Sequence, residues 1–377
     1  MSKWMTKLSS DWGIIASEIK KKAPQITASP SPSLNWATAN GTGGFQHGKI
    51  SILFGPESSG KSLIAMLSIV ELQKKDKEAL TLWIDSEFSF NLNLFEKIGG
   101  DCSRLILKKT NKPEEIFDFI GSEVLSHLQD GMPLKCLVID SIKSIRYPKE
   151  VNKKSTTDQH MGGTGSAYLG SAIKLILPVI HDYELLTFFV QQSTMQIDPM
   201  KALRNPYVMT EGQALKHSAD VLLEITKLDT KAGVVESGTT ISGAVQQIGH
   251  KVRIKVKKNR LGVPARMAQF TWHYDLGIID TDVEIFELAK SLGIIFHPIN
   301  PETGKANVQS WQFASYDPIR GEANMLAFVK ASKDLQQEIL QACYKYKDAV
   351  VTIDTDGMAT TDSTTTQKYL DDLEIEL

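Results

Sequence analysis

Short apolar runs recur through the middle of the chain and predict buried strands. They are Ile50–Phe54, Ala79–Ile84, Lys135–Ile139, Leu185–Val190, Val221–Ile225, Val252–Val256 and Ala268–Tyr274. Helical patterns fill the gaps at about 62–74, 114–128 and 166–181. Such alternation indicates an α/β fold with a mostly parallel central sheet covered by helices on both faces. The last runs follow one another closely, so we expect antiparallel pairing at one side.

The two ends of the chain have different patterns. Residues 4–20 carry large apolar side chains at helical spacing, which predicts a short amphipathic helix that packs on its own domain or on a neighbouring subunit. The Pro/Ser segment Ser29–Ser33 is expected to be a linker. A small α+β unit follows the core, and the acidic Thr-rich end is expected to be disordered and to solvate, to screen basic surface or to recruit a partner. The predicted units are 1–33, 34–282, 283–346 and 347–377.

Composition excludes several classes of protein. The chain is 42% hydrophobic and 23% charged with a formal net charge of -2, so bulk charge does not announce a nucleic-acid partner. Its three cysteines, Cys102, Cys136 and Cys343, form no CxxC pair, which suits a reducing compartment. The start of the chain has no long apolar core and no run reaches the length of a membrane span. We therefore expect a cytoplasmic protein with no membrane partner.

The stretch GPESSGKS directly behind the first strand is a phosphate-loop pattern. Its glycines let backbone N–H groups turn toward phosphate oxygens at a helix N-terminus, where the helix dipole favours anions. Lys61 is expected on the β- and γ-phosphates and Ser62 on Mg²⁺. The predicted cofactor-binding residues of this loop are Gly55, Pro56, Glu57, Ser58, Ser59, Gly60, Lys61, Ser62 and Leu63.

Three further strands end in polar side chains. Asp140 ends an apolar strand in the Walker-B arrangement that holds a metal ion. Glu87 follows another strand and is a candidate base for the attacking water. Gln192 is either a plain strand-end amide or a sensor of the γ-phosphate. Because ligands of open α/β sheets bind at the carboxyl ends of the strands, the sequence predicts one ATP and Mg²⁺ site with Glu87 and Lys61 as catalytic residues.

Beyond the loop, an ordered set of motifs resembles the RecA-type strand-exchange proteins, from about residue 33 to 280. The matching segments are Ser33–Trp36, Gly43–Ile50, GPESSGKS, His160–Gly162, Asn205–Pro206, Ala214–Lys216 and Lys258–Pro264. The size and acidic tail are similar to the phage UvsX-like branch. The resemblance implies that Lys258 and Arg260 reach the ATP of the adjoining subunit, and that loops at about 149–164 and 193–213 hold DNA. It also makes Gln192, as the sensor of the γ-phosphate, the third catalytic residue.

The residues that the resemblance implies for DNA binding are Lys153, Lys154, His160, Met161, Gly162, Lys201, Arg204, Tyr207 and Lys216. The first loop has a net charge of +1, and the second reaches +1 when Lys216 directly behind it is counted. Each is either a solvated excursion or a DNA contact that is repeated along a filament. Basic residues also alternate with Val252, Ile254 and Val256. This pattern is typical of an edge strand kept soluble by lysines, or of a subunit or DNA contact.

The function implied is an ATP-dependent recombinase, a DNA-dependent ATPase that pairs and exchanges homologous strands. Its implied partners are single-stranded and double-stranded DNA, further copies of the chain in a head-to-tail filament, a single-strand-binding protein and a recombination mediator. Two alternatives stay open at this point. One is a hexameric helicase with the same core, and the other is a regulatory ATPase without strand exchange.

Overall fold

The computed structural model describes residues 23–38, 43–146, 164–198, 200, 206–209, 213–228, 234–236, 247–274, 277–300, 303–345, 352–353 and 359–360. The predicted N-terminal helix at 4–20 and most of the acidic tail lie outside these ranges, and so do several predicted DNA contacts: Lys153, Lys154, His160, Met161, Gly162, Lys201 and Arg204.

An 11-stranded sheet in the order β13-β12-β11-β9-β3-β7-β6-β4-β5 organises the chain, with β8 and β10 attached to β7 and β11. Strands β9, β3, β7, β6, β4 and β5 are parallel. Their bounds are β3 Lys49–Gly55, β4 Leu80–Asp85, β5 Leu105–Lys109, β6 Leu134–Asp140, β7 Leu186–Met195 and β9 Val221–Lys227. The predicted parallel core is therefore confirmed.

The remaining strands of this sheet pair antiparallel, as the close spacing of the last runs suggested. They are β8 Tyr207–Met209, β10 Val234–Glu236, β11 Gln247–Asn259, β12 Met267–His273 and β13 Gly277–Ile279. The sequence reading missed β5, because Leu105–Leu107 is only three apolar residues before two lysines. A short, half-exposed strand of this kind is what an edge position permits.

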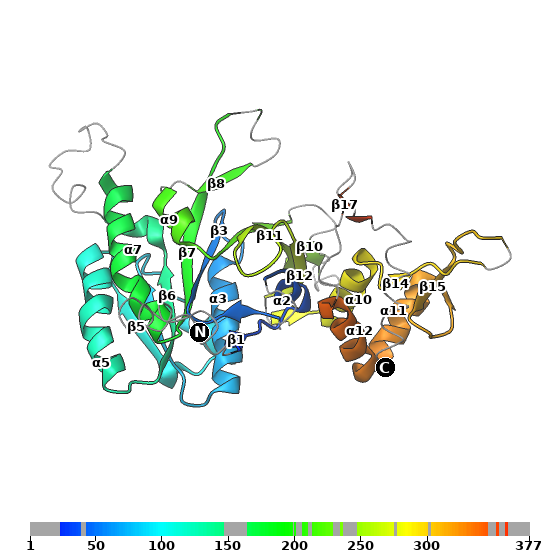
Figure 1. The fold of residues 1–377 in the computed structure, drawn as a ribbon, viewed down its shortest axis with the longest axis horizontal. Coiled ribbons are helices and arrows are strands. Elements are labelled where there is room, and N and C mark those ends of the chain that lie inside the picture. Colours follow the sequence, from blue (N-terminus) through cyan, green and yellow to red (C-terminus); the bar gives the residue numbers. More distant parts are fainter. Residues whose placement is uncertain are drawn as a thin grey trace, which may run out of the picture.

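Helices cover both faces of the sheet (Figure 1). One face packs on α3 Lys61–Lys75, and the other on α5 Leu125–Gln129, α7 Thr164–Asp182 and α9 Gln213–Ser218. Along β7 the side chains alternate between the two cores, since Phe188 belongs to the first and Phe189 to the second. The predicted helix at 114–128 begins with the wider turns η3 Glu114–Asp118 and η4 Ile120–Val124 before α5. No helix in the described ranges is long and apolar enough to cross a membrane.

Shorter elements connect these layers. They are β1 Ile26–Thr27, α2 Pro32–Thr38, β2 Phe45–Gln46, α4 Leu92–Lys97, η2 Cys102–Arg104 and η5 Ile142–Ser144. The late strands β17 Thr352–Ile353 and β18 Ala359–Thr360 pair with each other. The C-terminal part packs α10 Thr281–Ser291, α11 Glu322–Ala331 and α12 Lys333–Lys345 beside a sheet of β14 Ile295–Phe296, β15 Ser310–Phe313 and β16 Ile319–Arg320. These helices and strands lie at the right of Figure 1, beyond β12.

The Pro/Ser segment expected to be a linker is packed instead. Ser31 is completely buried, and its hydroxyl donates a hydrogen bond to Glu284 Oε1 of α10. The same oxygen accepts from Ser33 N at 2.8 Å, so a carboxylate lies at the N-terminus of α2, where the helix dipole favours it. Burial nevertheless raises the pKa of Glu284 to about 7, while the two serines oppose that rise.

Glu284→Gln tests the cost of this burial. A raised pKa means that the folded state binds the proton more tightly than the unfolded chain does. The contribution of Glu284 to stability is therefore fully present below its pKa in the unfolded chain, near 4.3, and is lost as the pH rises toward 7. We expect the variant to be more stable than the parent at pH 8, by up to about 3 kcal/mol. Denaturant unfolding at pH 4.5 and pH 8 checks this, and an equal difference at the two values would contradict it.

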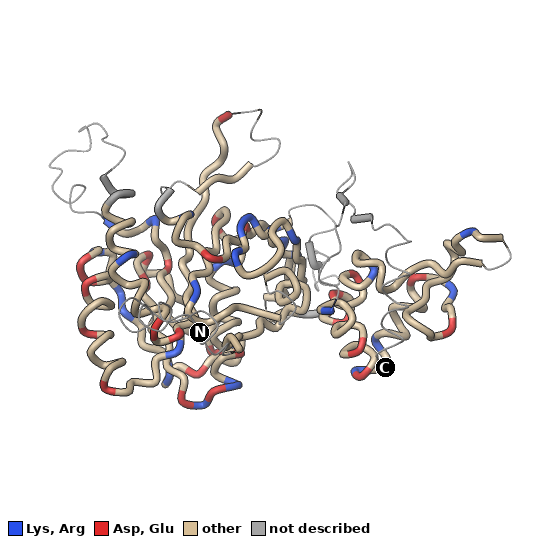
Figure 2. Tube along the Cα trace, in the orientation of Figure 1, with Lys and Arg blue, Asp and Glu red and all other residues tan. Residues whose placement is uncertain are grey.

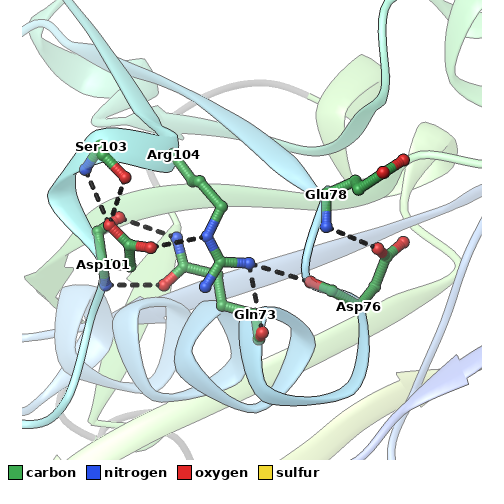
Figure 3. Close-up of polar contacts among 6 residues, drawn as sticks. All are labelled: Gln73, Asp76, Glu78, Asp101, Ser103 and Arg104. Carbon is green, nitrogen blue, oxygen red and sulfur yellow. Dashed lines mark hydrogen bonds and ion pairs between the residues drawn. The ribbon is translucent and has the colours of Figure 1, made fainter.

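Arg104 closes the C-terminal end of α3 (Figure 3). Its guanidinium donates to the carbonyl oxygens of Gln73 at 3.2 Å and Asp76 at 2.9 Å, and Nε lies 2.8 Å from Asp101 Oδ2. Gln73 and Asp101 also exchange two hydrogen bonds, at 2.9 and 3.0 Å. Hydrogen bonds from Ser103 and Arg104 lower the pKa of Asp101 to about 2. The helix that follows the phosphate loop is thus fixed at its far end.

Arg104→Ala is expected to lower the free energy of unfolding by about 1–2 kcal/mol, because it leaves two helix carbonyls without a cationic donor. Lys74→Ala is the matched control on the same turn. Its side chain is 62% exposed and pairs only with Glu71, so a change below about 0.5 kcal/mol is expected. Chemical denaturation of both variants measures the difference, and equal losses would refute the capping role.

Candidate functional site

The loop between β3 and α3 has the backbone that the phosphate-loop pattern predicts. Gly60 lies in the left-handed region at φ 96°, directly before the first residue of α3. At Gly55 a Cβ atom would stand 2.0 Å from the carbonyl oxygen of Ile225 on β9, so this position accepts only glycine. Ser58 also has a positive φ of 56°. The loop therefore curls back over the end of its own strand and opens onto the N-terminus of α3.

Two side chains at the start of α3 point to the site. Lys61 is only 7% exposed, and its ammonium donates to the carbonyl oxygen of Pro56 at 2.6 Å. Burial lowers the pKa of Lys61, while Asp140 and Glu87 oppose that shift. Ser62 Oγ on α3 donates to Asp140 Oδ2 at the end of β6, at 2.6 Å. The two predicted metal ligands are thus adjacent.

Asp140 ends β6 with 7% of its surface exposed. Burial raises the pKa of its carboxyl to about 6, the hydrogen bond from Ser62 lowers it, and the nearby Glu87 raises it again. Buried carboxylates are stabilised by a cation within a few ångströms. Hydroxyl and carboxylate oxygens are ligands that Mg²⁺ prefers, so Ser62 and Asp140 fit the predicted ion.

Glu87 is held by donors from β7 and from the segment directly after β6. Its Oε1 accepts from Gln192 Nε2 at 3.1 Å, from Ser144 Oγ at 3.1 Å and from Ser141 Oγ. The turn that carries Glu87 is fixed in addition by Asp85, whose carboxylate accepts from two backbone N–H groups at 3.0 and 3.1 Å. The structure thus brings Glu87 and Gln192 together, as the sequence predicted.

Ser141 and Ser144 were not expected as site residues. They follow Asp140 at the end of β6, and small polar residues directly behind a Walker-B strand were the signal that could have identified them. Within the loop, Pro56, Glu57 and Ser58 lie at the surface, and the buried Ser59 Oγ has no hydrogen-bond partner. The side chain of Leu63 packs in the hydrophobic core. Any cofactor contact of Leu63 is therefore limited to its backbone.

Lys258 and Arg260 lie further along the strands, away from the phosphate loop. On β11, Val252 flanks the phosphate loop, since a Cβ on Gly60 would lie 3.8 Å from its Cγ2. Lys258 stands six residues further along and is paired with Leu222, which lies opposite Ile52 in the middle of β3. At about 3.3 Å per residue these six residues span roughly 20 Å. Arg260 follows at the level of Asp220, which bonds to Ile50 near the amino end of β3. The two cations therefore do not belong to the nucleotide site of their own chain.

Tyr207 and Lys216, the described candidates for DNA contact, line one groove. It has a volume of about 640 Å³ and lies between the β7–β8 hairpin, α9 and the ends of β9 and β11. Its lining residues are Phe54, Gln196, Asp198, Met200, Tyr207, Val208, Met209, Lys216, Leu222 and Lys257. An aromatic ring, apolar side chains and two lysines are the groups that take up a base and its phosphate.

The basic residues that alternate with apolar ones on β11 do not lie on an edge strand. β11 is paired with β9 on one side and β12 on the other, so the expectation of an edge strand is wrong here. Val252, Ile254 and Val256 are buried, while Arg253 is exposed on the opposite face. Figure 2 shows Lys and Arg gathered along this strand. Lys257 of this strand pairs with Glu224 at 2.9 Å, and a subunit or DNA contact of the basic face stays a prediction.

A strand-loop-helix phosphate site with a strand-end aspartate defines a P-loop nucleotide-binding protein. The sequence model of the RecA N-terminal domain matches residues 6–279. Similar proteins include Protein RecA of Wolinella succinogenes, 27% identical over 85% of this chain and 83% of the relative. Protein RecA of Mesoplasma florum is 31% identical over 68% and 71%, and that of Bacillus velezensis 28% identical over 87% and 85%.

The chain therefore belongs to the RecA family. Its function is that of a RecA-type recombinase, and the helicase and regulatory alternatives are not favoured.

Ser141→Ala tests the support of Glu87. Losing this donor frees the carboxylate, so we expect the rate of ATP hydrolysis at saturating ATP to fall about tenfold with little change in nucleotide affinity. Steady-state kinetics and binding of a fluorescent ATP analogue separate the two effects. Ser122→Ala is the control, because it removes an exposed hydroxyl that donates a hydrogen bond to the carbonyl oxygen of Asp118. Unchanged turnover in the Ser141 variant would show that Glu87 is oriented without it.

Proposed function

We propose that this chain is a DNA-dependent ATPase that assembles head to tail on single-stranded DNA, with each ATP bound between two protomers. Lys61 and Ser62 of one protomer hold the phosphates, and Lys258 and Arg260 of the next approach from the other side. A contact between unlike surfaces that does not close produces an open helix, which is the geometry of a filament.

The observation that carries this proposal is the separation along β11. Half of a phosphate site lies at the carboxyl end of β3, whereas Lys258 is level with the middle of β3 and Arg260 with its amino end. Because Lys258 and Arg260 are too far from the phosphate loop of their own chain, their position fits a contact with the ATP bound by a neighbouring subunit. Arg and Lys supplied by an adjoining subunit stabilise the charge that develops on the phosphates.

Within one site the roles follow from the contacts described above. Lys61 would exchange the Pro56 carbonyl for phosphate oxygens. Ser62 and Asp140 would hold Mg²⁺, which neutralises developing phosphate charge when bound. Glu87, fixed by its three donors, would take a proton from the attacking water. These assignments require the site to be completed by a second copy.

Gln192 provides a path from nucleotide to DNA. It touches Glu87 and lies on β7, and three residues later Met195 of the same strand pairs with Tyr207. A shift of Gln192 toward a bound γ-phosphate would move this hairpin and the groove that it borders. Nucleotide state would thereby change the affinity for DNA, a coupling of the order–disorder kind.

Several parts of the proposal concern residues outside the described ranges. DNA contacts by Lys153, Lys154, His160, Met161, Gly162, Lys201 and Arg204 belong to it. The proposal also includes the unit boundaries at 33, 282 and 346 and a place in the UvsX-like branch. It further includes a cytoplasmic location and cooperation with a single-strand-binding protein and a mediator. The described groove at Tyr207 and Lys216 supports the second DNA loop only.

Lys61→Ala should abolish ATP hydrolysis that is stimulated by single-stranded DNA, and with it the formation of joint molecules between homologous DNAs. Lys74→Ala on the same helix is the control and should retain both activities. Electron microscopy with an ATP analogue and single-stranded DNA should show open helical filaments of the parent protein. Closed six-membered rings, or a rate of ATP hydrolysis that is the same with and without single-stranded DNA, would overturn the proposal.

A further inference from the structure

Asp220 lies where three strands of the sheet meet. It directly precedes β9, whose first residue Val221 pairs with Ser51 of β3 on one side and with Asn259 of β11 on the other. Asp220 N donates to Ile50 O at 2.9 Å, and Asp220 Oδ2 accepts from Ile50 N at 3.1 Å. One carboxylate oxygen is therefore tied to the start of the strand that runs into the phosphate loop.

The opposite side of Asp220 faces the turn after β11. Its carbonyl oxygen accepts from Arg260 N at 2.9 Å. Its second carboxylate oxygen, Oδ1, lies 3.8 Å from Arg260 Nη1. The Asp220 side chain is 18% exposed, whereas that of Arg260 is 52% exposed. A largely buried carboxylate thus stands behind a guanidinium that projects toward solvent.

Other contacts fix the turn without fixing the guanidinium. Asn259 Nδ2 donates to Thr38 O at 3.1 Å, and Asn259 Oδ1 accepts from Leu261 N at 2.9 Å. Lys258 Nζ donates to the carbonyl oxygens of Lys216 at 2.6 Å and His217 at 3.3 Å, at the end of α9. The backbone of the turn is rigid, and the direction of the Arg260 side chain depends on Asp220.

The length of the Arg260–Asp220 contact decides what it can do. At 3.8 Å it is an ion pair without a hydrogen bond, so the N–H groups of the guanidinium stay free for phosphate oxygens. An exposed pair contributes little to stability and is readily left. It does restrict the rotamers of a long side chain, which lowers the entropy lost when that side chain meets a ligand.

We propose that Asp220 is a positioning residue that aims Arg260 at the nucleotide of the neighbouring protomer. Its carboxylate joins the cation donated to one site with the strand that carries the phosphate loop of the next site along the filament. The inference rests on the proposed site between protomers. It adds a residue that the phosphate-loop and resemblance arguments do not include.

Asp220→Asn isolates the role of the charge, because its amide oxygen can still accept from Ile50 N. We expect DNA-stimulated ATP turnover to fall at least about tenfold, with thermal unfolding and binding of an ATP analogue close to those of the parent. Asp220→Ala removes both contacts and should lose more turnover. Parent-like turnover in Asp220→Asn would overturn the proposal.

Mixed filaments distinguish misplaced donation from a damaged fold. Glu87→Gln protomers should bind ATP and present an intact turn but should not hydrolyse. In an equimolar mixture with Asp220→Asn, about one quarter of the sites combine a competent loop with a competent donor, so turnover should rise above the sum of the separate proteins. Arg260→Ala mixed with Glu87→Gln should recover likewise. Lys61→Ala mixed with Glu87→Gln should not, because both changes damage the same half-site.

The outcomes separate the two levels of inference. Recovery of Arg260→Ala without recovery of Asp220→Asn would overturn the positioning role and leave the shared site standing. No recovery of Arg260→Ala would overturn the shared site, and the inference with it. Recovery of both, with no recovery of the Lys61→Ala mixture, is the expected result.

Discussion

A parallel sheet brings the carboxyl ends of its strands to one edge, and the nucleotide site depends on this constraint. The phosphate loop follows β3, Asp140 ends β6, Glu87 follows β4, and Gln192 lies on β7. These strands are neighbours in the sheet although more than a hundred residues separate the first from the last. The polar groups then meet in the site: Ser62 bonds to the buried Asp140, and Gln192 bonds to the half-buried Glu87. No single loop could hold these groups at such spacing without the sheet below them.

The same sheet keeps Lys258 and Arg260 away from that edge. Strand β11 runs antiparallel to β9, so the further the chain proceeds along β11, the further it moves from its own phosphate loop. Contacts on three sides hold the turn at its end: α9 carbonyls for Lys258, Thr38 for Asn259 and Asp220 for Arg260. A turn fixed in this way is suited to dock on another molecule, since little further ordering is needed on contact.

Much of the fold could be predicted from the sequence, because buried parallel strands are near-continuous apolar runs and this chain contains little else of that kind. The polar ends of β4, β6 and β7 also identified Glu87, Asp140 and Gln192. The supporting serines, Ser141 and Ser144, were missed. Their place directly behind the Walker-B strand was the available signal, but a hydroxyl there does not by itself show which side chain it bonds to. The burial of Ser31 on Glu284 was missed for a similar reason. Proline and serine are typical of linkers, and only the partner 253 residues away makes this segment part of the core.

The register shift in β11 between Val256 and Lys258 has a consequence for how this strand can change. Because side chains alternate along a strand, adding or removing one residue turns every later side chain to the other face. Adding or removing one residue ahead of Arg253 would bury Arg253 and expose its apolar neighbours. The register shift between Val256 and Lys258 already accommodates one extra residue. The strand can therefore vary in side chain but hardly in length. In a filament of this chain, the fixed length of β11 would keep the distance from one bound nucleotide to the next constant.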